Sequence, residues 1–327
     1  MPNIRQPRAG SLQYWPRKRS KRVHPRIRSS PKVKEIGLTT FAGYKVGMTH
    51  VIAIETSKHS HKKGEEISIP VTLIECPPLK FASVRLYKKG KLKLDKEIFF
   101  RSKDKYLRRR TNLPKKNLLS ELSKIDTEKF DDISVIVYTQ PNLTGIGKKK
   151  PELFELQVGG EDLSGKLEYI KQHIDREIQV NEVFKDGEIA DLKSVTKGKG
   201  FQGPVKRFGI SIRHAKSEKS IRNPGSLGPW IAQGHIMWRV AHAGKMGYHQ
   251  RTEYNKQLLK VISDPKEVII SGGFLNYGII KNPVVLIRGS VPGSRKRLII
   301  MQKAQRDYKT KSLPIINKVN LDSKQGN

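Results

Sequence analysis

The stretch Ile67-Ser-Ile-Pro-Val-Thr-Leu-Ile-Glu75 is the clearest indication of the fold in this chain. It is rich in β-branched residues and bounded by polar residues, which is typical of a β-strand. Because Pro70 has no backbone N–H to donate, the strand is expected to lie at a sheet edge or to break there. A second run, Thr49–Glu55 (THVIAIE), has the same character and predicts another strand.

Further runs of this kind predict that the chain is mainly β. They are Ile133–Thr139, Glu267–Ile270, Val284–Ile287 and Leu298–Met301. Helical spacing of apolar residues is rarer, and both examples fall in the centre of the chain. Leu118, Leu122 and Ile125 recur at i, i+4 and i+7, and Leu167, Ile170 and Ile174 recur at i, i+3 and i+7.

These patterns predict a β-barrel built from both ends of the chain, with an α+β subdomain inserted between them. The expected parts are a basic N-terminal arm at 1–35, a barrel from 36–80, 180–196 and 253–303, an inserted α+β subdomain at 81–179, a basic Gly/Trp finger at 197–252, and a polar C-terminal tail at 304–327. In the tail, only Leu313–Ile316 is apolar enough to dock on the rest of the chain.

The charge of the chain points to its partner. The 327 residues include 65 Lys and Arg against 30 Asp and Glu, a formal net charge of +35. A free compact globule with this charge would repel itself, so the chain is expected to bind a polyanion. RNA or DNA is the leading partner class, and an acidic membrane surface is a distant second.

Several classes of protein are disfavoured. A single cysteine, Cys76, excludes an intramolecular disulfide framework and suits a reducing compartment. The N-terminal basic stretch is not followed by an apolar run, so no signal peptide is expected. The most apolar window, Val268–Ile287, is interrupted by glycine, asparagine, lysine and proline, so no membrane span is expected.

The N-terminal segment concentrates positive charge. Residues 1–34 contain eleven Lys and Arg, no acidic residue and five prolines. Prolines keep the backbone extended, and the segment lacks the periodic apolar residues needed to fold alone. Because terminal blocks of like charge are often nucleic-acid-binding arms, we expect an extended basic arm, with a disordered solubility tail as the alternative.

The centre of the chain has the opposite charge. Residues 120–191 carry sixteen Asp and Glu against nine Lys and Arg. We expect them to form an ordinary solvated domain surface that faces away from the polyanion.

A second basic segment follows. Residues 197–260 carry thirteen Lys and Arg against Glu218 and Glu253, and 197–247 contain nine glycines together with Trp230 and Trp238. Glycine lets a backbone approach a partner closely, Lys and Arg meet phosphates, and aromatic rings stack on bases. We therefore expect a finger inserted into folded nucleic acid, with a flexible surface loop as the alternative.

Motifs of nucleotide and metal sites are weak here. Gly198–Gly203 matches G-x-G-x-x-G, but Pro204 follows and a parallel βαβ context is missing, so a glycine-hinged turn is favoured. Thr144–Lys150 lacks the earlier glycine and the Ser/Thr of a phosphate loop, which leaves a basic turn. His59 and His61 lack further ligands for zinc and indicate a polar turn.

Neither a metal site nor a protein-bound cofactor is expected, apart from Mg²⁺ associated with RNA. His235, His242 and His249, seven residues apart, are interpreted as RNA-facing or structural. Hydrolase motifs are lacking, and only two carboxylates lie in the second basic segment, which argues against an enzyme.

Five blocks, taken together, resemble one family. They are Gly10–Leu12 with Trp15–Arg19; Thr40–His50; Val195–Gly203 with Lys206–Gly209; Gly228–Trp230 with His235–Trp238 and Ala243–Thr252; and Gly272–Phe274, Tyr277–Gly278 and Gly289–Gly293 with Lys296–Arg297. The chain resembles the universal large-subunit ribosomal proteins of the L-three family, in their archaeal form.

The resemblance implies a translation-protein-type closed β-barrel with an inserted α+β subdomain and long basic extensions. It implies a structural constituent of the large ribosomal subunit, located in the cytoplasm in the ribosome. Such a protein would stabilise rRNA and act in subunit assembly. Its partners would be large-subunit rRNA and neighbouring ribosomal proteins, with no membrane and no homo-oligomer.

The finger would then reach toward the peptidyl transferase centre, with Trp230 at the position of the family's tip tryptophan. The eukaryotic histidine that becomes methylated is replaced by Glu218, so that modification is not expected. Pro229 stands where alanine is commoner in the family.

The residues expected to bind RNA come from the arm, the finger and two barrel segments. They are Arg17, Lys18, Arg19, Lys21, Arg22, Arg26, Arg28, Lys45, Lys197, Lys199, Lys206, Arg207, Arg213, His214, Arg222, Trp230, His235, Trp238, Arg239, Lys245, Tyr248, His249, Arg251, Arg295, Lys296 and Arg297. A DNA-architectural protein and an RNA-modifying enzyme with a basic substrate channel are the alternative functions.

Overall fold

The structure is a computed structural model. It describes residues 11–88, 93–100, 104–114, 122, 125–230, 234–306 and 312–322. The chain divides into two compact units, each described by itself below. Unit 1 comprises Met1–Arg22 and Val195–Gln250, and unit 2 comprises Val23–Ser194 and Arg251–Asn327.

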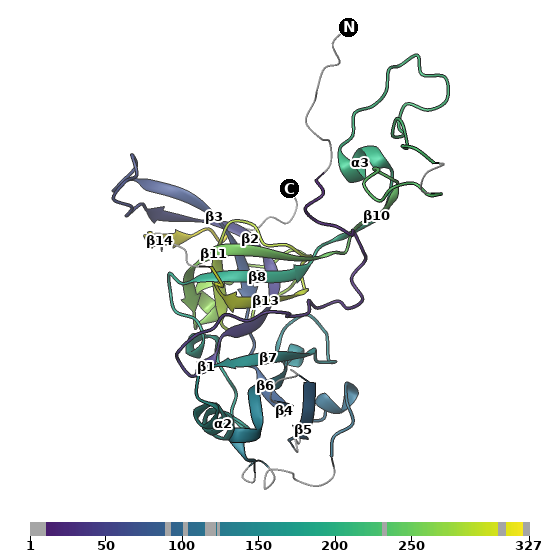
Figure 1. Ribbon diagram of the computed structural model, residues 1–327. Helices are drawn as coiled ribbons and strands as arrows, with labels where there is room; N and C mark the ends of the chain where they lie inside the picture. The colour runs from purple at the N-terminus through teal and green to yellow at the C-terminus, as the bar shows by residue number, and fades with distance from the viewer. Residues whose placement is uncertain are drawn as a thin grey trace. The chain divides into compact units, whose positions relative to one another are not determined.

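Unit 2 contains a closed ring of strands drawn from both ends of the chain (Figure 1). In order around the ring these are β2 (Thr40–Ile54), β3 (Glu66–Glu75), β12 (Val284–Arg288), β11 (Gln250–Ile262), β8 (Ile189–Val195) and β13 (Leu298–Lys303), which pairs back onto β2. The expectation of a mainly β chain with closed β structure is confirmed.

Pro70 shows how β3 is built. β3 pairs with β2 from Glu66 to Glu75, but it pairs with β12 only from Val71 onward. At Pro70 the strand therefore has a sheet neighbour on one side only, and its carbonyl accepts the amide of Gly289 at 2.7 Å. The expected edge position is confirmed for this half of the strand, which needs no N–H from proline there.

A second, five-stranded sheet has the order β1-β7-β6-β4-β5. Its strands are β1 (Gly37–Leu38), β4 (Lys80–Lys88), β5 (Lys93–Phe99), β6 (Phe130–Tyr138) and β7 (Leu153–Gly159). Helix α2 (Leu163–Gln172) packs near β6; Asp162 caps it by accepting the amides of Ser164 and Gly165. Leu167 and Ile170 are buried as their spacing predicts, whereas Ile174 lies beyond the helix.

The remaining elements are short. The 3₁₀ helices are Leu107–Arg109, Thr127–Lys129, Pro141–Leu143, Val180–Glu182 and Pro265–Val268, and β14 (Ile315–Val319) pairs with the outer part of β2. The strand expected at Glu267–Ile270 is wrong: Pro265 begins a 3₁₀ turn there, and the Asp264 carboxylate accepts the Lys266 amide. Residues 115–121, where most of the first helix was expected, lie outside the described residues.

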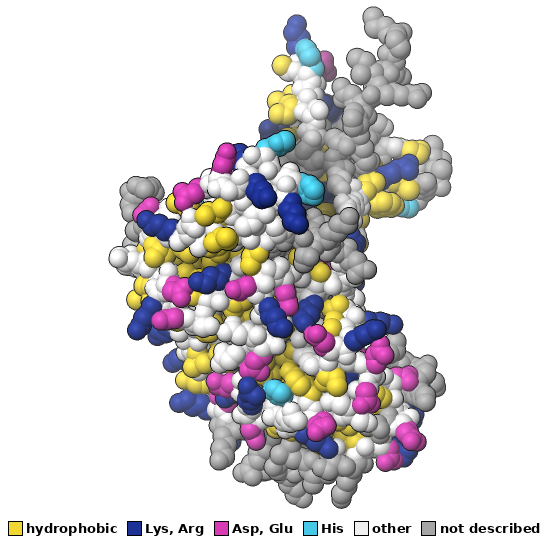
Figure 2. Space-filling model, turned by 90° about the vertical axis from the view of Figure 1, so that its left-hand side faces the viewer, with side chains coloured by type: hydrophobic (Ala, Val, Ile, Leu, Met, Phe, Trp, Pro, Cys, Tyr) yellow, Lys and Arg dark blue, Asp and Glu magenta, His cyan; other side chains and the backbone are white. Residues whose placement is uncertain are grey.

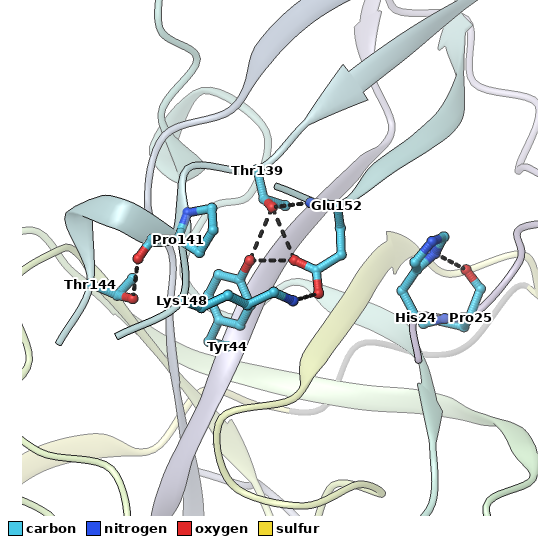
Figure 3. Close-up of polar contacts among 8 residues, drawn as sticks. All are labelled: His24, Pro25, Tyr44, Thr139, Pro141, Thr144, Lys148 and Glu152. Carbon is cyan, nitrogen blue, oxygen red and sulfur yellow. Dashed lines mark hydrogen bonds and ion pairs between the residues drawn. The ribbon is translucent and has the colours of Figure 1, made fainter. Parts of the chain in front are cut away.

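A buried polar cluster joins the two sheets of unit 2 (Figure 3). The Tyr44 hydroxyl on β2 lies 2.7 Å from Glu152 Oε2 and 3.0 Å from Thr139 Oγ1, and Lys148 forms an ion pair with Glu152. Burial, followed by the charge of Glu152, raises the pKa of Tyr44, so the phenol remains a donor at neutral pH.

A second buried carboxylate, that of Glu75, fixes the segment that precedes β12. It accepts the backbone amides of Lys281 and Asn282 at 2.9 and 3.0 Å, the Asn282 side chain at 2.7 Å, and the Tyr277 hydroxyl. Burial raises the pKa of Tyr277, and Glu75 raises it further. Each buried polar group here has a partner, as a core requires.

The ring also depends on one glycine. A Cβ on Gly43 would lie 2.7 Å from the Glu75 carbonyl and 2.8 Å from the Cys76 sulfur. Because both are held inside the ring, β2 approaches β3 closely only with glycine at this position.

Part of the basic N-terminal segment belongs to unit 2. His24 is buried beside Phe154, and the Val33 carbonyl accepts the amide of Gly160 at 2.8 Å. The Ser29 carbonyl accepts from Lys193 at 3.1 Å and from Gln302 at 3.0 Å. Residues 23–34 thus fold onto the sheets, while the preceding residues belong to unit 1. In the part of the chain that the structure describes, no helix has the length and apolar character to cross a membrane.

Candidate nucleic-acid interface

The described frame of unit 1 is a two-stranded ribbon. β9 (Gly198–Gln202) pairs antiparallel with β10 (Gly244–Gly247), and the Tyr248 amide donates to the Lys197 carbonyl at 3.1 Å. Gly247 has φ +73°, and a Cβ there would lie 2.0 Å from that same carbonyl. The ribbon therefore closes only with glycine at this position, and it carries the exposed side chains of Lys199 and Lys245.

A single-turn helix, α3 (Pro204–Phe208), follows the ribbon. Proline opens it, and Gly209, with φ +68°, ends it in the left-handed conformation. Arg207 Nε donates to the Lys245 carbonyl at 3.1 Å and Nη1 donates to the His242 carbonyl at 2.9 Å. Arg207 thus ties the helix to the returning strand of the ribbon.

Residues 210–243 of unit 1 form neither helix nor strand where the structure describes them. A few contacts organise the segment. The Arg213 amide donates to the Ile221 carbonyl at 2.9 Å, its guanidinium donates to the Pro224 carbonyl, and the Trp230 carbonyl accepts the Gly234 amide at 2.8 Å. Most of its side chains are exposed, so its backbone is accessible to a partner.

Residues 11–22 of the basic arm lie against this frame. Arg17 Nη1 donates to the Arg207 carbonyl at 2.6 Å, and Nη2 donates to the Ser11 carbonyl at 3.2 Å. His249 Nδ1 lies 2.7 Å from the Lys18 carbonyl, and the Ser20 amide donates to the Tyr248 carbonyl at 2.8 Å. Residues 11–22 and the finger therefore form one structure, held together mainly by hydrogen bonds to backbone carbonyls.

An aromatic cluster lies at the same junction. The rings of Trp15 and Phe208 stack with centroids 5.5 Å apart and planes 23° apart, and Trp238 meets Trp15 edge-on at 5.5 Å and 74°. The Arg17 guanidinium lies 4.1 Å from the Phe208 centroid. The edge-on contact of Trp238 and the position of Arg17 over Phe208 are both favourable, because ring edges and cations are attracted to ring faces.

Nearly all the charged side chains of unit 1 are positive. Its sequence holds 17 Lys and Arg against one acidic residue, Glu218, whereas unit 2 has 48 against 29. Burial lowers the pKa of Arg17, and burial together with the charge of Arg17 lowers that of Arg207; both remain protonated near neutral pH. In unit 2, by contrast, the surface over β4–β7 and α2 shows acidic and basic side chains interspersed (Figure 2).

Known proteins resemble this chain over nearly its whole length. The family model for ribosomal protein L3 matches residues 1–326. Proteins named large ribosomal subunit protein uL3 are 47% identical in Archaeoglobus fulgidus, 45% in Methanothermobacter thermautotrophicus and 44% in Methanococcus vannielii, each over 98% of both chains. The chain belongs to the ribosomal protein L3 family.

Membership of the L3 family confirms the resemblance found in the sequence. It also confirms the expectation that the chain is not an enzyme, and the alternative of an RNA-modifying enzyme is wrong. All the residues predicted to bind RNA are described, and they fall into three groups by exposure and place.

Most of the predicted residues are exposed. In unit 1 these are Lys18, Arg19, Lys21, Arg22, Lys197, Lys199, Lys206, Arg213, His214, Arg222, Trp230, His235, Trp238, Arg239 and Lys245, and in unit 2 they are Arg26, Arg28 and Lys296.

Six predicted residues are half-buried. Arg17, Arg207 and Tyr248 belong to the arm–finger junction, and Arg251, Arg295 and Arg297 belong to unit 2. Arg295 Nη1 donates to the Leu275 carbonyl at 2.7 Å.

Two predicted residues are buried. His249 is 7% exposed and contacts the Lys18 carbonyl, as described above. Lys45 is 9% exposed, and its ammonium donates to the carbonyls of Val291 and Gly293, which lie in the turn before β13. In this structure both side chains are used to hold backbone in place.

Three aromatic residues of the interface were absent from the prediction. Phe201 on β9 is 73% exposed, Trp15 joins the aromatic cluster, and Phe208 forms its buried base. All three lie within the blocks that resemble the family. Aromatic residues interleaved with Lys and Arg were the signal that could have identified them.

The remaining motifs have structural roles. The helix after Gly203 has five residues and β9 pairs antiparallel, unlike a dinucleotide-binding unit. Lys148 is paired with Glu152, and His59 and His61 lie exposed in the turn between β2 and β3. Among the described residues no three His, Cys, Asp or Glu side chains gather as metal ligands would.

Proposed function

We propose that this chain is a structural constituent of the large ribosomal subunit in the cytoplasm. It binds and stabilises large-subunit rRNA through unit 1, acts in subunit assembly, and extends residues 197–252 toward the peptidyl transferase centre. Family membership and the names of the relatives support the place in the subunit. The charge of unit 1, 17 Lys and Arg against Glu218 alone, is the observation that carries the RNA-binding role.

The scarcity of buried apolar side chains among the described residues of unit 1 supports the same role. Both hydrophobic clusters of described residues lie in unit 2, and apart from proline the described part of unit 1 buries only Val195 and Phe208 as apolar residues. A strongly basic segment without a core gains most of its order from a partner of opposite charge. Phosphates provide that partner, and any Mg²⁺ at the interface belongs to the RNA.

The mechanism is charge neutralisation combined with insertion. Each Lys or Arg that meets a phosphate releases a condensed counterion, so log affinity falls linearly with log salt concentration, by about 0.7–0.9 per contact. The neighbouring ribosomal proteins meet the rest of the molecule, including the mixed-charge surface of unit 2 seen in Figure 2.

The first test compares two matched sets of charges. In one variant Lys18, Arg19, Lys21 and Arg22 become glutamine, and in the other the equally exposed Lys58, Lys62, Lys63 and Lys266 of unit 2 become glutamine. Binding to large-subunit rRNA is measured over a range of salt concentrations. The salt slope is the slope of log affinity against log salt concentration. It should become shallower by about 3 in the arm variant and stay near the wild-type value in the control.

Equal slopes for the two variants and the wild type would contradict the role of the arm. Deletion of residues 1–34 is the stronger form of this experiment and should weaken RNA association further, although it also removes the contacts that His24 and Val33 make within unit 2.

The second test concerns Trp230, which is 61% exposed. Trp230→Ala should impair subunit assembly or tRNA handling while the ring of strands stays folded. Normal translation by ribosomes that carry this variant would contradict a role of Trp230 in subunit assembly or tRNA handling. A DNA-architectural function would be favoured if the cellular protein were recovered on DNA instead of in large subunits.

A further inference from the structure

Trp238 is unusual because it is both exposed and held in place. Its side chain is 59% accessible, although tryptophan normally buries most of its large surface. Its edge contact with Trp15, at 74° between planes, leaves a ring face that packs against no other aromatic ring among the described residues.

The rest of the cluster limits how far Trp238 can move. Trp15 is itself stacked on Phe208, which is 5% exposed, and Arg17 covers the Phe208 ring at 4.1 Å. Arg17 is fixed in turn by its bonds to the carbonyls of Arg207 and Ser11. A ring fixed before binding loses little conformational entropy when a ligand stacks on it.

Trp230 provides a contrast. It is as exposed as Trp238, at 61%, but among the described residues no aromatic ring packs against it. The two tryptophans therefore differ in preorganisation and hardly at all in accessibility.

Two donor atoms of the cluster are buried without an acceptor among the described residues. Trp15 Nε1 and Arg17 Nε are buried and have no partner in the part of the chain that the structure describes. Both groups are donors, and a buried donor without a partner is costly. Nucleic acid is rich in the kind of group that these donors lack, because base edges and phosphates carry acceptors.

We propose that the Trp15–Phe208–Trp238 cluster is a preformed platform on which one unpaired nucleobase stacks against Trp238. This inference rests on the proposed function, because it assumes that RNA reaches unit 1. It adds the chemical class of the ligand at one defined place and separates that place from the finger tip at Trp230.

The surrounding charge favours a nucleobase over an apolar side chain of a protein. Trp238 is followed by the exposed Arg239, and Arg17 and Arg207 lie at the base of the cluster. A base brings its own phosphate to neutralise such cations, whereas an apolar protein side chain would bury them without compensation.

The first experiment measures the affinity of the full chain for large-subunit rRNA at several salt concentrations. Trp238→Ala should lower the affinity by about tenfold, within the range of roughly 5–150-fold that loss of one base–aromatic stack produces. Trp238→Phe, which keeps a ring face, should recover most of the affinity, and Trp238→Leu should not. The salt slope should stay unchanged in all three variants.

Protection of the Ser20 amide from hydrogen exchange serves as the folding control, because it donates to Tyr248 only while the arm is in place. If Trp238→Ala and Trp238→Leu bind as tightly as the wild type, the platform is refuted. If affinity falls only together with loss of Ser20 protection, and Trp238→Phe does not recover it, Trp238 is a packing residue and the platform is again refuted.

The second experiment detects the stack itself. The chain contains three tryptophans, so Trp15→Phe with Trp230→Phe leaves Trp238 as the only indole, and Trp15→Phe with Trp238→Phe leaves Trp230 as the matched control. Addition of large-subunit rRNA should quench Trp238 fluorescence with the salt dependence of binding.

Unchanged Trp238 fluorescence in a complex with the wild-type salt slope would overturn the platform and leave the proposed function standing. Quenching that requires other ribosomal proteins and not rRNA would assign Trp238 to a protein contact and also overturn it. Failure of the wild-type chain to bind rRNA at all would refute the proposed function, which the salt titration alone would show.

Discussion

Unit 1 and unit 2 are stabilised by different interactions although they belong to one chain. Unit 2 buries two hydrophobic clusters and satisfies buried carboxylates such as Glu75 and Glu152 with several donors each. Unit 1 is held by arginine–carbonyl bonds, one glycine-dependent ribbon and a small aromatic cluster. The first has a hydrophobic core of its own, and under the proposed function the second gains further order from rRNA.

The difference shows why the charge is divided so unequally. A segment that carries 17 Lys and Arg against one carboxylate repels itself, which lowers its stability unless counter-charges are supplied. Unit 2 carries 29 carboxylates against its 48 Lys and Arg, which permits ordinary ion pairs such as Arg85 with Glu97 and Glu155. Positive charge is thus concentrated where a phosphate backbone can offset it.

Two phenylalanine substitutions, one in each unit, should differ most in their effect on the free energy of unfolding. Phe41 is fully buried on β2, and Phe41→Ala should destabilise unit 2 by about 3–5 kcal/mol through lost burial and a cavity. Phe201→Ala removes a ring that is 73% exposed on β9, so it should leave the free energy of unfolding within about 0.5 kcal/mol of the wild type. Urea denaturation measures both.

The effects of the two substitutions on rRNA binding should be the reverse of their effects on stability. Phe201→Ala should weaken binding of the folded chain, while Phe41→Ala should bind normally under conditions in which it is still folded. Equal losses of stability in the two variants would mean that the ribbon of unit 1 belongs to the same cooperative core as unit 2.

Two glycines of unit 1 allow a second, smaller test. Gly247→Ala places a Cβ against the Lys197 carbonyl at φ +73°, which costs about 1–2 kcal/mol for the left-handed backbone in addition to the clash. The Tyr248 amide should then exchange faster with solvent, while amides of the ring of strands keep their protection. Gly203→Ala is the control, because its Cβ would meet nothing within 4 Å.

If Gly247→Ala lowered the midpoint of global unfolding as much as a core substitution does, the two units would unfold together. That outcome would contradict the view of unit 1 as a separately ordered surface.

Acid pH should weaken unit 2 through Glu155. Burial alone would raise the pKa of Glu155, but hydrogen bonds from Ser134 and Tyr87 and the charge of Arg85 lower it overall. A lowered pKa in the folded state adds stability above the unfolded-state value of 4.5, and this stability is lost as pH falls through the folded-state pKa.

Glu155→Gln should therefore cost about 1–2 kcal/mol at neutral pH, near the lower end of the roughly 1.5–3 kcal/mol typical of hydrogen bonds to a charged group, because the Glu155 side chain is partly exposed. Below a pH of about 4 the difference from the wild type should shrink, which urea titrations at the two pH values would detect. A constant difference at both pH values would show that the charge of Glu155 does not contribute.

Arg17→Lys should have the smallest effect, because it keeps the charge of the arm and removes the guanidinium contacts. The stack on Phe208 is worth about 0.5–1 kcal/mol at a partly exposed site. Exchange of the Ser20 amide should accelerate by about 2–5-fold, which corresponds to that loss, while the salt slope of rRNA binding stays unchanged. A flatter slope would mean that Arg17 itself neutralises a phosphate.

The strands that the sequence predicted best are those that obey local rules. β3, β6, β12 and β13 contain short apolar runs; β3, β12 and β13 lie within two residues of their expected bounds, and β6 begins three residues before its expected start. β11 and β5 carry many polar residues, and only their partners in the sheets make them strands, so local patterns could not reveal them. At Glu267–Ile270 the apolar pattern correctly indicated that Val268 is buried. It wrongly indicated a strand, because Pro265 begins a 3₁₀ helix there.

The candidate interface was predictable in composition and not in geometry. Charge and aromatic content selected positions such as Lys199 and Trp238, which the structure places at the surface, and their binding to RNA stays a prediction. The burial of Lys45 and His249 depends on carbonyls of distant segments, which a linear pattern does not show. For the same reason Trp15 was not recognised as the support of Trp238.

A cross-linking map between this chain and large-subunit rRNA would show directly which unit meets the RNA. Lysines and aromatic residues that cross-link in assembled subunits are located along the sequence and compared between the units. Cross-links should concentrate in residues 11–22 and 195–250, with Trp238 and Lys199 among them. Cross-links confined to unit 2, with unit 1 unmodified by RNA, would contradict the RNA-binding role of unit 1.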